Sequence, residues 1–166
     1  MKNQSIALPV STPDGKFIAC YTDQGLAGLS FPSKRTGGNN PPDGKVASSI
    51  LRWHRATTSA IKQTLAGRAV KTLPPLDLTG GTEFQRAVWS AMRKIRAGQT
   101  RSYGEIARQI GKPTAVRAVG GACGANPIPV LVPCHRVLAA NRKLGGFSGG
   151  LEWKLRLLGR EGVRVQ

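Results

Sequence analysis

Acidic residues are scarce in this sequence. Eight Asp and Glu stand against 25 Lys and Arg, which gives a formal net charge of +17. This excess is far from the near-neutral balance of a typical cytosolic enzyme. It predicts attraction to a polyanion, and nucleic acid is the commonest one. An anionic membrane surface is the competing partner.

Long apolar runs are also missing. No stretch approaches the roughly 18 residues that a membrane span needs. Residues 2–12 mix polar and apolar side chains, so they do not resemble a secretory signal segment. We therefore expect a soluble, cytoplasmic protein that does not bind a membrane.

Cysteines are few and odd in number. Cys20, Cys123 and Cys134 form no paired framework and match no zinc spacing. The first half holds only Cys20 and His54 as soft metal ligands, too few for a four-ligand site, so we predict no metal. Such a sparse set suits a reducing compartment and leaves one thiol free to react; we expect Cys123 to be structural.

The positive charge is unevenly divided. Residues 1–80 carry ten Lys or Arg and four Asp, whereas residues 81–166 carry fifteen and four Glu, and eleven of those fifteen are Arg. The planar guanidinium of Arg pairs with phosphate and stacks on bases, so this bias favours nucleic-acid contact. A basic but passive surface is the alternative.

The first half reads as a mixed α/β unit. Residues 16–21 and 26–31 have strand character and are separated by a turn, which predicts a hairpin. A polar loop follows at 32–44, and apolar residues then recur at helical spacing from Val46 until a stop near Gly67. After an extended linker around residues 73–76, we place a domain boundary near Gly80–Gly81.

The second half opens with two helix-start patterns. Thr82 with Gln85, and Ser102 with Glu105, each predict a capping box, and Thr114 is predicted to cap a third helix that runs towards Cys123. Two short helices joined by a glycine-containing turn are typical of a helix-turn-helix, although an ordinary helical hairpin fits equally well. The last helix carries small side chains, which allow close approach to another surface such as a DNA groove.

A cysteine and a histidine stand side by side in Pro133-Cys134-His135-Arg136. A thiol reacts as its thiolate, and a neighbouring imidazole is the usual means of forming one near neutral pH. Alone, the pair is weak, because a buried cysteine beside a structural histidine is the commoner case. The flanking segments Asn126–Pro129 and Gly145–Gly150 change that balance.

With these flanks, residues 100–161 resemble the O6-alkylguanine-DNA alkyltransferase family, whose signature is Pro-Cys-His-Arg-Val. The resemblance implies an α/β (α+β) fold: a ribonuclease H-like α/β scaffold at 1–80, then a mostly helical, winged-helix-like helix-turn-helix domain at 81–166. It also implies that no cofactor is used.

By this resemblance, the Cys134 thiolate takes the alkyl group from guanine O6. His135 draws the thiol proton through a water, and Glu161 orients and charge-balances the imidazole. Asn126 matches the asparagine of the hinge before the active-site loop, where an amide holds backbone groups. From the residues alone, Asn126 is equally an ordinary turn residue and Glu161 a surface charge.

The resemblance also assigns the DNA-binding residues. A base inside a duplex must be flipped out before a thiol can reach it, and the gap must be filled. Arg117 matches the family's intercalating arginine, and Tyr103 matches the tyrosine that helps rotate the nucleotide; Thr114 and Ala118 accompany them at the DNA. Read without the family, Arg117 is a phosphate contact or solvated charge and Tyr103 a core aromatic.

The substrate pocket is assigned in the same way. The backbone carbonyl of Val137 would read the guanine amino group, and the backbone amide at Ser148 would donate to O6. Phe147 would form an apolar wall, and Tyr103 would contact the flipped base.

The resulting prediction is a DNA-repair methyltransferase that acts once, on double-stranded DNA that contains O6-alkylguanine. O4-alkylthymine is a second candidate lesion. We expect a monomer that can cluster on DNA. The main alternative is a non-enzymatic helix-turn-helix module that binds alkylated DNA, against which the presence of Cys134 argues. A cysteine hydrolase is the second alternative, but nothing predicts a peptide or ester pocket.

Overall fold

The computed structural model describes residues 5–34, 42 and 44–165. The first half contains a three-stranded antiparallel sheet in the order β1-β2-β3, formed by β1 (Ile6–Thr12), β2 (Gly15–Thr22) and β3 (Gly25–Ser30). The predicted hairpin is confirmed as β2–β3. The strand β1 was not predicted, because Pro9 interrupts its apolar pattern; proline is accepted there because β1 is an edge strand.

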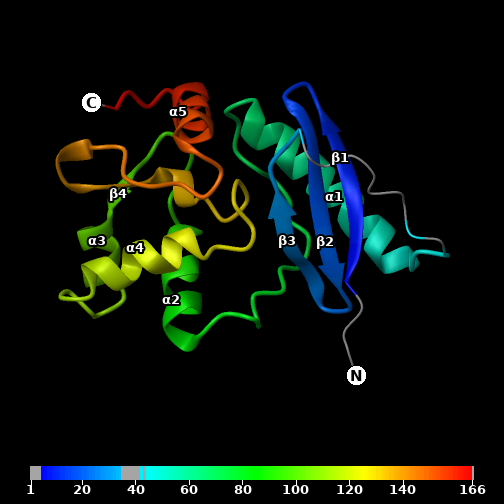
Figure 1. Ribbon diagram of the computed structural model, residues 1–166, viewed down its shortest axis with the longest axis horizontal. Helices are drawn as coiled ribbons and strands as arrows, with labels where there is room; N and C mark the ends of the chain where they lie inside the picture. Colours follow the sequence, from blue (N-terminus) through cyan, green and yellow to red (C-terminus); the bar gives the residue numbers. More distant parts are fainter. Residues whose placement is uncertain (1–4, 35–41, 43, 166) are drawn as a thin grey trace.

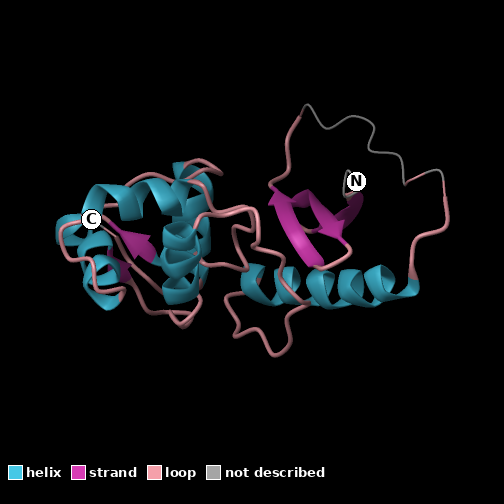
Figure 2. Ribbon diagram, turned by 90° about the horizontal axis from the view of Figure 1, so that it is seen from below, coloured by secondary structure: helices cyan, strands magenta, loops and turns pink. Residues whose placement is uncertain are grey.

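Helix α1 (Ser48–Leu65) covers one face of this sheet (Figures 1 and 2). Its apolar side is buried against the strands through Ile50, Ala60, Ile61 and Leu65, at the helical spacing that the sequence predicts. The chain leaves the helix at Gly67, which has a φ of 72°. A Cβ on this residue would clash with the carbonyl oxygen of Arg160 in the second half, so only glycine fits there.

The predicted linker is extended, and it is also paired with the sheet. The amide of Leu26 donates to Pro75 O at 2.8 Å, and the amide of Asp77 donates to Leu26 O at 2.7 Å. These bonds form a parallel bridge between Leu26 and Leu76 beside β3. The connection between the two halves is therefore held in place along the sheet edge.

The second half is mostly helical, as predicted, and the fold is mixed α/β. Its elements are α2 (Glu83–Met92), β4 (Arg101–Ser102), α3 (Tyr103–Gln109), α4 (Val116–Gly124), η1 (Cys134–Arg136), β5 (Val137–Leu138), η2 (Ala140–Arg142) and α5 (Leu151–Arg160). Both predicted capping boxes are present, at Thr82 with Gln85 and at Ser102 with Glu105. The short strands β4 and β5 pair in parallel.

The predicted cap at Thr114 is wrong. Helix α4 has Ala115 as its N-cap, and no side chain caps it. The amide of Ala115 instead donates to Lys112 O at 2.9 Å, so a backbone turn leads directly into the helix and leaves no place for a hydroxyl cap. The polar loop predicted at 32–44 falls mostly outside the described residues.

The two halves share one continuous apolar core. A single buried cluster runs from Leu8 in the sheet to Leu157 in α5. Across the junction, the amide of Leu29 donates to Pro127 O at 2.9 Å, and Arg160 forms a bidentate ion pair with Asp14 at 2.6 and 2.7 Å. The boundary near residue 80 stays a prediction. Within the described chain, no helix has the length and apolar character to cross a membrane.

Candidate functional site

Cys134 begins the short helix η1 and is only 4% exposed. The loop before it is held by the side chain of Asn126, whose Nδ2 donates to Val132 O at 2.8 Å and whose Oδ1 accepts from the amide of Ile128 at 2.9 Å. Between these two bonds, Val130 has a φ of 75°, which is unusual for a β-branched residue. Asn126 therefore occupies the backbone-holding position that the sequence predicts, and it fixes the strained turn that delivers Cys134.

His135 and Glu161 form a buried pair. The His135 Nε2 lies 3.0 Å from Glu161 Oε1, and their side chains are 0% and 1% exposed. Arg136 also donates to Glu161 through both Nε and NH2, and its NH1 donates to Ile95 O at 2.7 Å. Burial alone would raise the pKa of Glu161, but the hydrogen bonds from His135 and Arg136 outweigh it and lower the pKa to about 2.

The ionised Glu161 sets the tautomer of His135. A carboxylate only accepts hydrogen bonds, so the proton of a neutral imidazole must be on Nε2. Burial lowers the pKa of His135, against the opposing effect of Glu161, so the ring is neutral near pH 7. The buried Nδ1 bonds to no group in the described part of the chain. This nitrogen has a free lone pair on the side away from Glu161, so it can act as a base.

The resting form of Cys134 is the protonated thiol. Burial raises its pKa, although a hydrogen bond from Asn126 and the charge of Lys154 act in the opposite direction. A thiol of this kind needs a base at the moment of reaction, because too little thiolate is present beforehand. The neutral imidazole of His135 is the basic group that adjoins it in the chain.

Lys154 is an additional feature of the site that sequence reasoning missed. This side chain on α5 is fully buried, and its Nζ donates to Val137 O at 2.7 Å and to Gly146 O at 3.1 Å. Burial lowers its pKa to about 8, while the two nearby thiols, Cys134 and Cys123, act to raise it. Lys154 therefore ties the chain after η1 to the glycine-rich loop and brings a cation towards Cys134.

Cys123 lies within electrostatic range of Cys134, and burial raises the pKa of both thiols, but Cys123 has a thioether as its neighbour. Its Sγ contacts Met92 Sδ at 3.5 Å, and burial raises the pKa of its thiol to about 12. A thiol with such a pKa is not nucleophilic near neutral pH. These properties agree with the structural role predicted for Cys123.

The predicted pocket residues have different surroundings in the structure. Tyr103 is half-buried beside the glycine-rich loop, where a Cβ on Gly145 would lie 2.8 Å from its hydroxyl. Phe147 instead packs edge-on against Phe31 of the first half, with ring centroids 5.6 Å apart, and Ser148 is exposed. Of the four predicted pocket residues, Tyr103 and Val137 therefore have contacts close to Cys134 and Lys154, while Phe147 contacts the opposite half.

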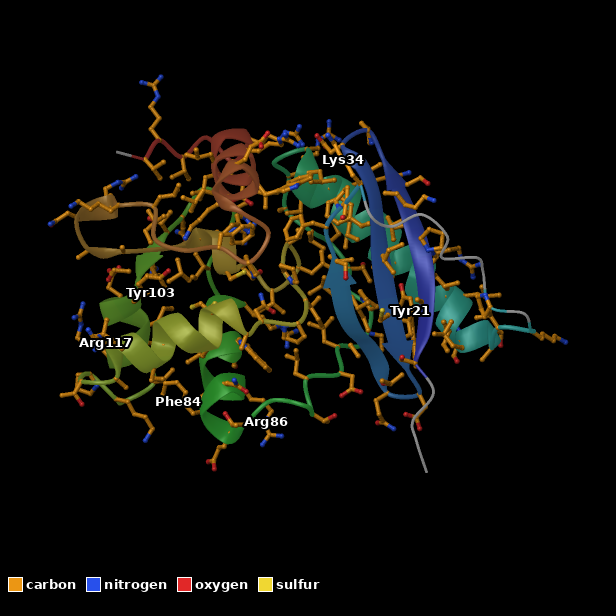
Figure 3. All side chains as sticks on the ribbon, viewed as in Figure 1. Tyr21, Lys34, Phe84, Arg86, Tyr103 and Arg117 are labelled. Carbon is orange, nitrogen blue, oxygen red and sulfur yellow. The ribbon has the colours of Figure 1, made fainter. Side chains whose placement is uncertain are left out.

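The exposed face of helix α4 carries several residues with small side chains or none. Arg117 and Ala118 are exposed near its start, and Figure 3 places Arg117 at the outer edge of the helical half. A Cβ added at Gly120, Gly121 or Gly124 would meet no atom within 4 Å. The helix packs against α2 and α3, as the second helix of a helix-turn-helix does. Thr114 is exposed in the turn before it.

Arg136 is the other functional residue that was missed. It belongs to the quoted motif, but its partner Glu161 follows 25 residues later, so no local pattern reveals the pair. For Lys154 there was a usable signal. Lys154 stands three and four residues before the buried Leu157 and Leu158, on the side of α5 where helical spacing expects a buried side chain.

Comparison with known proteins gives one family. Residues 83–163 match the family described as 6-O-methylguanine DNA methyltransferase, DNA binding domain. A methylated-DNA–protein-cysteine methyltransferase of Methanosarcina acetivorans is 40% identical over 151 residues, which are 91% of this chain and 94% of the relative. The chain belongs to the methylated-DNA–protein-cysteine methyltransferase family. The alkyltransferase resemblance of the sequence is thereby confirmed.

Two further similarities agree. A relative of the same name from Mycolicibacterium paratuberculosis is 53% identical over 110 residues; the match spans 64% of this chain and 66% of that protein, just under two thirds. The solved structure of Mycobacterium tuberculosis OGT in complex with DNA superposes with a TM-score of 0.74 at 37% identity, covering 92% of this chain and 90% of that one. Both halves of the present fold therefore have a counterpart in the family.

Proposed function

We propose that this protein repairs alkylated DNA by moving an alkyl group from guanine O6 to the sulfur of Cys134. The single observation that supports this best is the buried arrangement at Cys134. The protonated thiol of Cys134 is followed by the neutral imidazole of His135, whose Nε2 is hydrogen-bonded to the ionised carboxylate of Glu161. Such a set of groups can deprotonate a thiol to its thiolate during the reaction.

In the proposed reaction, the thiol proton passes through a water to His135 Nδ1, and the imidazolium is stabilised by Glu161. The Cys134 Sγ–carbon bond forms as the carbon–O6 bond breaks. The proton then ends on the departing guanine, so that thiol and O6-alkylguanine become thioether and guanine. The thioether is stable and is not reversed by this reaction, so each molecule acts once.

Lys154 supports the same step. Its pKa of about 8 leaves it mostly charged at neutral pH, and a buried cation favours the thiolate form of Cys134. It also occupies one lone pair of the Val137 carbonyl at 2.7 Å. A carbonyl oxygen has two, so the second remains for the guanine amino group that was predicted to bind there.

On the DNA side, we propose that α4 lies in a groove of the duplex and that Arg117 fills the gap left by the flipped nucleotide. The exposed glycine and alanine positions of α4 let its backbone approach DNA closely. Tyr103, at the start of α3, would meet the base between this helix and the glycine-rich loop. Thr114 and Ala118 would also contact the DNA.

We also propose that the protein works in the cytoplasm as a monomer that can cluster on DNA, with 1–80 and 81–166 as its two domains. Its three cysteines are free thiols, which suits a reducing compartment.

The test is intact-protein mass spectrometry after incubation with a duplex that contains O6-methylguanine, with Cys134→Ala alongside. We expect the protein to gain one methyl group and the variant none. Tight binding to the lesion without a mass gain would instead favour the non-enzymatic module. A gain in the variant would show that another residue accepts the group.

A further inference from the structure

Helix α1 carries a cationic stripe that has no counter-charge. Between Gly44 and Leu76 the sequence contains six Lys or Arg and no Asp or Glu. Three of these cations, Arg55, Lys62 and Arg68, line one shallow groove on the outer side of α1, with a volume of about 480 Å³. All three side chains are exposed. The α1 groove, as we call it, therefore presents a local concentration of unneutralised positive charge.

The fold does not use these charges. No hydrogen bond or ion pair joins the side chains of Arg55, Lys62 or Arg68 to the described residues. The carboxylate of Asp14 lies beyond Lys62 in a neighbouring hollow, but Arg160 already binds it with both terminal nitrogens. Lys62, in the last turn of α1, interacts favourably with the helix dipole, but Arg55 in the middle of the helix and Arg68 beyond its end do not. Their presence is better explained by a partner than by stability.

Beside Ala66 and His54, the remaining lining of the groove consists of side chains that can bind phosphate oxygens. Thr58, Ser59 and Gln63 stand among the cations and carry hydroxyl and amide groups that donate hydrogen bonds. Contacts from such side chains, together with Arg and Lys, make up most protein–DNA hydrogen bonds to the backbone. The groove offers no arrangement for reading bases, so any recognition there would be independent of sequence.

A lipid surface fits the groove less well. A helix that lies on a membrane needs an exposed apolar face beside its basic one. The apolar face of α1 is buried in the sheet, and among its large apolar side chains only Leu51 is exposed, at 43%. The charge of α1 is therefore not accompanied by the apolar area that membrane insertion requires.

The groove lies far from the helices that would bind the lesion. In Figure 1, α3 and α4 are at the left end of the molecule, whereas α1 runs from the right-hand edge to the middle, where its C-terminal end meets α5. Figure 2 shows the sheet on one side of α1 only. The outer side of α1 is thus free to meet a second nucleic-acid segment while α4 is engaged.

We propose that the α1 groove binds the phosphodiester backbone of a second DNA duplex segment, so that one molecule contacts two segments at once. This extends the proposed function without being required for it, because alkyl transfer at Cys134 does not involve α1. The role of the groove is to hold the protein near DNA, or to join neighbouring segments, independently of the lesion.

The test compares two triple variants of equal charge. Arg55→Gln, Lys62→Gln and Arg68→Gln neutralise the groove; Lys16→Gln, Lys94→Gln and Arg164→Gln remove three exposed cations from elsewhere. A duplex fixed to beads is loaded with protein, and capture of a second, fluorescent duplex is measured. We expect the groove variant to lose this capture and the control variant to keep most of it.

Salt dependence gives a second measurement. Each phosphate contact contributes about 0.9 to the slope of log affinity against log salt, so the groove variant should lower the slope for undamaged duplex by about 2 to 3. Equal loss in both triple variants would show a general charge effect and overturn the proposal. So would unchanged capture in the groove variant, or a larger loss on phosphatidylglycerol vesicles than on duplex.

The two proposals fail separately. Reaction of both triple variants with free O6-benzylguanine should match the unaltered protein, because that reaction needs only the site around Cys134. If the groove variant reacts normally with the free base and still captures the second duplex, only the α1 proposal is wrong. If the unaltered protein does not react, the proposed repair function is wrong whatever the capture assay shows.

Discussion

At the scale of single residues, Glu161 serves two partners at once. It receives hydrogen bonds from His135 at 3.0 Å and from Arg136 at 2.7 Å, and its own side chain is 1% exposed. The same carboxylate therefore fixes the imidazole that we propose as the base, and it anchors the motif to the end of α5. On this proposal, activity and stability both depend on the charge of Glu161.

We expect Glu161→Gln to lower the free energy of unfolding by roughly 3 to 5 kcal/mol at neutral pH, because it removes one member of a buried ionic group. Glu161 titrates near 4.5 when unfolded and near 2 when folded. Its stabilisation is therefore complete above about pH 4.5 and is lost as the pH falls towards 2. Urea unfolding across this range should show the two proteins converging in acid; a constant difference would contradict this account.

The charge of Lys154 should affect the rate at which Cys134 is alkylated. We expect Lys154→Met to slow alkylation of Cys134 by free O6-benzylguanine roughly tenfold, the effect of about one pKa unit on the thiol. In the unaltered protein, the rate should fall as the pH rises through about 8, where Lys154 loses its charge. The Met variant should lack this alkaline fall.

If Lys154 had only a structural role, the dependence of the rate on pH would be different. The variant would then be slower but would keep the same alkaline limb, and the electrostatic role would be rejected. Near-ultraviolet circular dichroism of the variant checks that the loop around Gly146, which Lys154 binds, is still folded.

The residues that sequence analysis missed share a cause. Cys134, His135 and Glu161 were predicted through a family motif, and the structure brings His135 and Glu161 together. Lys154 lay in a helix rich in Arg, where a lysine is normally solvated. The helical spacing of α5 indicates its buried side, but its partners, the carbonyls of Val137 and Gly146, come from tertiary packing that no local pattern encodes.

At the scale of elements, the helix starts were the most predictable features. The two capping boxes are local hydrogen-bond patterns between residues three apart, so the sequence contains all the information that they need. Strand β1 and the start of α4 were less predictable, because an edge position tolerates Pro9 and a backbone turn replaces the cap. Tertiary context decided both.

Helix α4 gives a prediction for Arg117. Arg117→Ala should slow repair of O6-methylguanine in a duplex by about tenfold or more, because flipping a paired base costs a few kcal/mol and an intercalated side chain offsets part of it. Reaction with free O6-benzylguanine should change little. The matched control is Arg86→Ala, an exposed arginine on α2 (Figure 3).

Equal losses on the duplex and on the free base would reject the intercalating role of Arg117. Equal losses for the Arg117 and Arg86 variants on the duplex would also reject it, since removal of one positive charge would then explain both. Single-turnover rates on the two substrates separate these outcomes.

At the scale of the whole molecule, the core is continuous from the sheet to α5, and Cys134 lies inside it. A methyl group added to the sulfur of Cys134, a residue that is 4% exposed, must be accommodated among the buried side chains around it. Overpacking of this kind typically costs about 1 to 3 kcal/mol. We therefore expect alkylation to destabilise the entire fold.

The melting temperature of the alkylated protein should fall by about 2 to 4 °C for each kcal/mol of this cost. Calorimetry of protein alkylated by O6-methylguanine duplex, freed of DNA, measures it, and Cys134→Ala exposed to the same duplex is the control. A melting temperature equal to or above that of the free protein would contradict the prediction.

The outer face of α4 has a further consequence for how the protein finds damage. Because Gly120, Gly121 and Gly124 carry no side chains, few side chains beyond Val116 and Arg117, at the start of α4, would contact successive base pairs as the helix moves along a groove. The energy of the complex then varies little from one position to the next. On the proposed single-use reaction, each molecule must inspect many intact base pairs first, and a helix with few protruding side chains would let it diffuse along DNA between them.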